Sequence, residues 1–79
     1  MTKLQNQVYE ILASVLEVNK KEIRPNSTWA DYNADSLDVV ELVLALEDHF
    51  QLSFETGELK SIRTVGELVA AVERKVQSG

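Results

Sequence analysis

Residues 33–50, NADSLDVVELVLALEDHF, have the spacing of a helix with two apolar sides. At about 100° per residue, one side gathers five apolar side chains with the spacing of a core-facing stripe, Val39, Leu42, Val43, Leu46 and Phe50. The opposite side holds three more, Leu37, Val40 and Leu44. The pattern predicts a helix from about Ser36 to Phe50, with a second apolar side that the core does not account for.

This second side is narrow and is interleaved with the carboxylates of Glu41, Glu47 and Asp48. A loop of the same domain could cover it, as loops often cover apolar patches. However, unpaired carboxylates are costly to bury, and a small exposed apolar patch rimmed by charge is typical of a transient docking site. We therefore favour a surface that other proteins contact.

The start of the helix has the residues of a capping box, with Asp35 as N-cap and Asp38 three residues later. Ser36 lies between them, where free amides and the helix dipole favour an anion by roughly 0.3–1 kcal/mol. Serine is ordinary at a helix start, but a phosphodiester there would be well placed. Catalysis by a Ser-His pair is excluded, because His49, the only histidine, lies about 20 Å further along the same helix.

Two further segments precede this helix. A helix is predicted over about residues 3–17 by the spacing of Leu4, Val8, Ile11, Leu12 and Val15. Pro25 then breaks the pattern, so that a long loop runs from about Val18 to Ala34 with three hydrophobic anchors, Ile23, Trp29 and Tyr32.

After residue 50 a short helix is expected within residues 54–60. Thr64 and Glu67 predict the cap of the last helix, whose buried stripe would be Val65, Leu68, Val69, Val72 and Val76. No segment alternates as a strand does. We expect an all-α fold in a single domain, residues 1–79: a small helical bundle of three main helices plus one short helix, with a long first loop.

The amino-acid composition excludes several classes of function. The 79 residues include no cysteine, which excludes disulfides, thiolate metal sites and a cysteine nucleophile. The net charge of −5 argues against nucleic acid as a partner. No apolar run is long enough to span a membrane and no signal peptide begins the chain, so we expect a cytoplasmic protein.

Charge is unevenly distributed. Eight of the 13 acids and no lysine or arginine lie between Arg24 and Lys60, which suits basic partners, although a solvated acidic surface would look the same. Asp31, Asn33 and Asp35 match the first three ligand positions of an EF-hand. Ser36 and Leu42 then stand where that loop needs glycine and glutamate, so no metal site is predicted.

The segment ADSLDVVELVLALEDHF closely resembles the second-helix motif of acyl carrier proteins, and IRTVGELVAAVERKV (residues 62–76) is similar to their last helix. The resemblance covers nearly the whole chain. It departs in the loop before the motif, where WADYNADSL has Tyr32 for the usual leucine and Asn33 for the usual glycine. Asparagine tolerates the left-handed backbone that glycine supplies, so we expect the turn to be preserved.

The resemblance implies that Ser36 receives 4′-phosphopantetheine from coenzyme A through a phosphopantetheinyl transferase. It also implies that the second helix docks on basic patches of acyl-processing synthase enzymes through Asp35, Leu37, Asp38, Val40, Glu41, Leu44, Glu47 and Asp48. The acyl chain would fold back among core residues, for which we assign Val39, Leu42, Val43, Leu46 and Phe50.

We therefore expect a freestanding carrier, monomeric and without catalytic residues, that tethers acyl intermediates as thioesters in fatty-acid or polyketide-type biosynthesis. Two alternatives stay open. One is an unmodified helical adaptor that uses the same acidic docking face. The other is an aminoacyl or peptidyl carrier, which Asp35 and the acids after Ser36 disfavour.

Overall fold

The computed structural model describes residues 2–78, except for the side chain of residue 78. Within this range the chain is helical and contains no strand; an isolated bridge pairs Thr28 with Thr64. The prediction of an all-α fold is confirmed. Four α-helices and two short 3-10 helices follow in the order α1 Lys3–Leu16, η1 Lys20–Glu22, η2 Trp29–Tyr32, α2 Ser36–Phe50, α3 Thr56–Ser61 and α4 Val65–Ser78.

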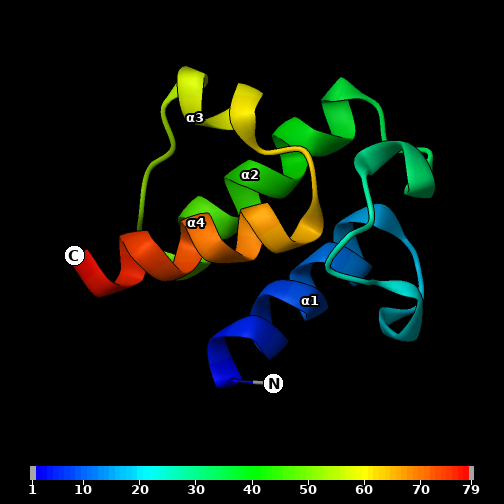
Figure 1. Ribbon diagram of the computed structural model, residues 1–79, viewed down its shortest axis with the longest axis horizontal. Coiled ribbons are helices and arrows are strands. Elements are labelled where there is room, and N and C mark those ends of the chain that lie inside the picture. Colours follow the sequence, from blue (N-terminus) through cyan, green and yellow to red (C-terminus); the bar gives the residue numbers. More distant parts are fainter. Residues whose placement is uncertain (1, 79) are drawn as a thin grey trace.

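Helices α1, α2 and α4 enclose the core, and α3 lies to one side of them (Figure 1). The fully buried side chains come from these three helices at the spacing that the sequence predicts, namely Val8, Leu12, Leu42, Leu46, Val65, Leu68 and Val72. One predicted core position is wrong. Val76 remains 41% exposed, because the last turn of α4 projects beyond the other helices (Figure 1).

The long first connection is ordered by specific hydrogen bonds. Ile23 is buried, and the Tyr32 hydroxyl accepts from the Arg24 amide (3.2 Å) and donates to the Glu22 carbonyl (3.3 Å). The indole Nε1 of Trp29 donates to the carbonyl of Ile62 at 3.3 Å. The aromatic anchors thus fasten η2 to the rest of the loop and to the start of the turn into α4.

The same connection also caps α4. The Val65 amide donates to the Ser27 carbonyl (3.0 Å) and the Gly66 amide to the Pro25 carbonyl (2.8 Å), so two of the helix's unpaired first amides are satisfied. A Cβ atom at Gly66 would lie 3.1 Å from the Pro25 oxygen, which explains a glycine here. The predicted cap is confirmed: Thr64 Oγ1 accepts from the Glu67 amide at 3.2 Å and Glu67 Oε1 from the Thr64 amide at 3.0 Å.

Within residues 2–78, no helix has the length and apolar character needed to cross a membrane.

Candidate functional site at the start of α2

The turn that leads into α2 is set by Asn33. Its φ of 55° lies in the left-handed region, as expected for an asparagine in place of glycine. This conformation ends η2, with the Asn33 amide donating to the Ala30 carbonyl (3.1 Å) and the Ala34 amide to that of Trp29 (3.0 Å). Because these two hydrogen bonds tie the turn to η2, the start of α2 is held next to η2.

The first turn of α2 is held by a reciprocal pair of hydrogen bonds. The Asp38 amide donates to Asp35 Oδ1 at 2.9 Å, and the Asp35 amide donates to Asp38 Oδ2 at 3.1 Å. The capping box predicted from the sequence is confirmed. Because a capping box supplies partners for only part of the free amides, those of Ser36 and Leu37 still point toward the open end of the helix.

Ser36 is the first residue of α2, and its side chain is exposed. Among residues 2–78, no hydrogen bond engages its hydroxyl. His49 lies thirteen residues further along the same helix, where its ring meets that of Phe50 edge-on with centroids 4.8 Å apart. No histidine is therefore near the serine, and the hydroxyl is free for chemistry supplied by another molecule.

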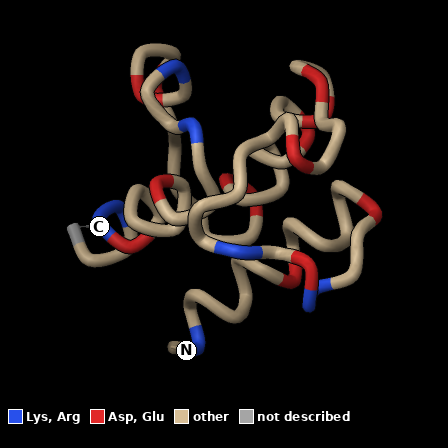
Figure 2. The backbone as a smooth tube through the Cα atoms, turned by 45° about the vertical axis from the view of Figure 1, so that its right-hand side comes forward, with Lys and Arg blue, Asp and Glu red and all other residues tan. Residues whose placement is uncertain are grey.

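The outer side of α2 is uncovered. Leu37, Val40 and Leu44 are 63%, 51% and 59% exposed, so the long loop does not pack on this side. Glu41 and Asp48 beside them are also exposed. Figure 2 shows that the tube from η2 into α2 bears acidic and no basic segments. Apolar side chains, carboxylates and the serine thus share one open surface.

Three of the predicted docking residues, Asp35, Asp38 and Glu47, also bond within the protein through their side chains, and the last two are half-buried. Glu47 is half-buried, and its Oε2 accepts a hydrogen bond from the Phe54 amide at 2.8 Å. Asp38 is half-buried as the second member of the capping box. The other six, Asp35, Leu37, Val40, Glu41, Leu44 and Asp48, are exposed. The structure therefore brings all eight to the outer side or the start of α2 but leaves two less accessible than the sequence pattern suggests.

The inner side of α2 faces the core. Leu42, Val43 and Leu46 are 1%, 7% and 0% exposed. Val39 and Phe50, at the ends of this stripe, are only half-buried. The predicted stripe is thus closed in its middle and partly open at both ends. Among residues 2–78, no group of three or more metal-ligating side chains is close enough to hold an ion.

The comparisons with known proteins agree with this geometry. Residues 6–72 match the family model described as a phosphopantetheine attachment site. The chain is 43% identical to the acyl carrier protein of Helicobacter hepaticus over 67 residues, 84% of this chain and 88% of the other. It is 41% identical to that of Wolinella succinogenes over 69 residues, 86% and 91% of the two chains.

Solved structures of acyl carrier proteins also superpose on this chain. The crystal structure of an acyl carrier protein from Thermotoga maritima superposes with a TM-score of 0.82 at 30% identity, covering 96% of this chain and 89% of that one. The solution structure of holo acyl carrier protein from Geobacter metallireducens gives a TM-score of 0.86 at 26% identity, covering 98% and 90%. The helical arrangement is therefore shared along nearly the full length.

Proposed function

This chain belongs to the acyl carrier proteins, and from that premise we propose that Ser36 is the residue that bears its 4′-phosphopantetheine. Proteins of this family hold acyl intermediates as thioesters on a covalently attached phosphopantetheine arm. When bound, the group supplies the thiol that this cysteine-free chain lacks.

The observation that carries the assignment is the exposed, unbonded hydroxyl of Ser36 at the amino end of a 15-residue helix. A phosphodiester on this oxygen would be held by the amino end of α2, where the free amides of Ser36 and Leu37 and the helix dipole favour a negative charge. The carboxylates of Asp35 and Asp38 are engaged by each other's amides, which holds the turn in place whether or not the serine is modified.

The chain's only histidine is at the far end of the same helix, and the carboxylates nearest in sequence to Ser36, those of Asp35 and Asp38, already accept each other's backbone amides. A phosphopantetheinyl transferase therefore removes the proton from Ser36. For the same reason we propose that the protein is a carrier and not an enzyme, since a catalytic serine would need a base within hydrogen-bond reach.

We assign the outer side of α2 as the surface that partner enzymes contact. Its centre is apolar, with Leu37, Val40 and Leu44, and its rim is acidic, with Asp35, Glu41 and Asp48. A partner with a shallow apolar patch ringed by lysine and arginine complements this surface, and the charges would speed association at low salt. Asp38 and Glu47 contribute chiefly by holding the helix start and the following loop.

The inner stripe of α2 is the assigned contact surface for the acyl chain. Leu42 and Leu46 are completely enclosed, so an acyl chain that enters between the helices has to displace packed side chains. Entry is easiest beside Val39 or Phe50, where the stripe is half-buried. We further propose a monomeric, cytoplasmic carrier of fatty-acid or polyketide-type intermediates. An unmodified adaptor and an aminoacyl or peptidyl carrier receive no support from the relatives.

The modification is tested by incubating the purified apo protein with coenzyme A and a broad-specificity phosphopantetheinyl transferase, followed by intact mass spectrometry. The expected result is a gain of one phosphopantetheine in the wild type and in Ser53→Ala, and no gain in Ser36→Ala. Ser53 is the matched control, because it is an exposed serine in the loop after α2. A wild type that gains nothing would favour the adaptor.

A further inference from the structure

Helix α3 is attached to the bundle differently from the other helices. It is six residues long and contributes no buried residue, whereas α1, α2 and α4 all contribute side chains to the core. A Cβ atom at Gly57 would meet nothing within 4 Å. Figure 1 shows α3 set apart from the body between two connecting segments. Burial therefore supplies little of the free energy that keeps α3 in place.

One side chain of α4 contacts this region twice. The ammonium of Lys75 donates to Glu58 Oε1 of α3 at 2.8 Å. The same nitrogen lies 5.1 Å from the centre of the Phe54 ring, in the segment that leads into α3. Lys75 and Glu58 are only 23% and 34% exposed at their side chains, so water competes less for this pair than for a surface pair.

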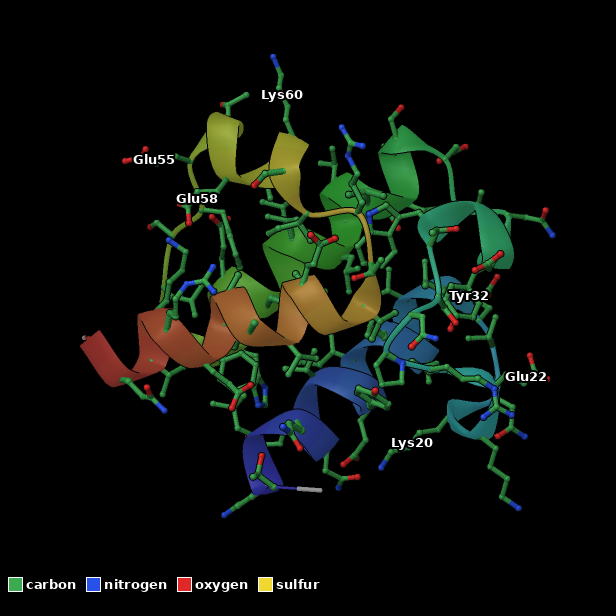
Figure 3. All side chains as sticks on the ribbon, in the orientation of Figure 1. Lys20, Glu22, Tyr32, Glu55, Glu58 and Lys60 are labelled. Carbon is green, nitrogen blue, oxygen red and sulfur yellow. The ribbon has the colours of Figure 1, made fainter. Side chains whose placement is uncertain are left out.

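The orientation of the charged side chains on α3 supports a specific contact. Glu58 lies on the side of α3 that faces the bundle, whereas Lys60 projects away from the molecule (Figure 3). Glu58 Oε1 also accepts the Glu55 amide at 2.9 Å, so it links the cap of α3 to α4. The segment that leads into α3 is also held by α2, because Glu47 Oε2 accepts a hydrogen bond from the Phe54 amide.

We propose that Lys75 is a latch that holds residues 54–61 against α4, and that this segment opens by detaching and unfolding as one cooperative unit while α1, α2 and α4 remain folded. Opening breaks the contacts of Lys75 with Glu58 and Phe54. It also uncovers the side chain of Phe54, which packs against the core, and the half-buried side chain of Leu59. The proposal does not depend on the modification of Ser36.

Amide hydrogen exchange tests the latch on the purified full chain. The informative amides are Phe54, Leu59 and Ile62, whose hydrogen bonds break when the segment opens. In Lys75→Gln we expect exchange at these amides to be about fivefold faster, in keeping with the loss of a partly buried ion pair and a cation–π contact. Exchange at amides within α1, such as Leu12, should be unchanged.

Two further variants separate a latch from a general effect of charge. Lys60→Gln removes the same charge from α3 itself and should leave exchange unchanged, and Lys75→Arg should keep most of the protection because it preserves both contacts. Equal acceleration in Lys60→Gln would overturn the proposal. So would a Lys75→Gln protein with unchanged exchange at residues 54–62, or with the same acceleration in every helix.

Discussion

Asp35 and Asp38 each accept the other's backbone amide, at 2.9 and 3.1 Å, on either side of Ser36 and Leu37. This pair fixes the turn from which the serine projects. We predict that Asp35→Ala destabilises the protein by about 1 kcal/mol, the usual loss when an N-cap aspartate is removed. Urea unfolding measures the change. Asp48→Ala is the control, because Asp48 is an exposed aspartate outside the cap; equal losses in both variants would contradict this role of the pair.

The docking surface predicts a charge effect on association. Glu41→Lys should slow modification by the transferase severalfold, and the difference from wild type should shrink as salt increases. Steady-state kinetics over a range of salt concentrations measures this. Glu22→Lys makes the same charge change on η1 and should have a much smaller effect. Rates for Glu41→Lys that match those of wild type at every salt concentration would count against the assignment of this surface.

The two glycines in described helices predict opposite responses to alanine. Gly57 is surrounded by open space, so Gly57→Ala should stabilise the protein by roughly 0.4–1 kcal/mol through the reduced freedom of the unfolded chain. At Gly66 a Cβ atom meets the Pro25 oxygen at 3.1 Å, and that oxygen is fixed by its hydrogen bond with the Gly66 amide. Gly66→Ala should therefore be destabilising. Thermal unfolding of both variants tests the contrast, which fails if Gly66→Ala is the more stable of the two.

We expect the contribution of Glu58 to stability to depend on pH in the acid range. Its hydrogen bond with Lys75, followed by that with the Glu55 amide, lowers its pKa below the ordinary value of 4.5. A carboxyl group with a lowered folded pKa contributes stability above its unfolded pKa, and this contribution is lost as pH falls through the folded pKa. In Lys75→Gln the pKa of Glu58 should rise toward 4.5. An NMR titration of its side-chain carboxyl measures this; an unchanged pKa would mean that the Lys75 contact is not formed in solution.

Local signals allowed much of the fold and the candidate site to be predicted. The capping boxes at Asp35 and Thr64 each lie within four residues, and the two stripes of α2 follow from helical periodicity alone. The left-handed turn at Asn33 could be expected because asparagine tolerates that backbone. These features depend on neighbours in sequence, so the sequence pattern was sufficient.

Features that depend on distant parts of the chain were missed or wrong. Lys75 meets Glu58 across 17 positions and Trp29 meets Ile62 across 33, and neither pairing has a local signal. Val76 fits the apolar stripe of α4 yet is exposed, because burial also depends on where the neighbouring helices end. Gly66 near the start of a helix was the one visible hint of close approach by another segment.

The position of the prosthetic group can be measured directly. After modification by the transferase, peptide fragmentation by tandem mass spectrometry locates the added phosphopantetheine on a single residue. We predict that it lies on Ser36, in a protein whose helical content is unchanged by the reaction. An adduct on any other residue, or a Ser36→Ala protein that is modified as fast as wild type, would contradict it.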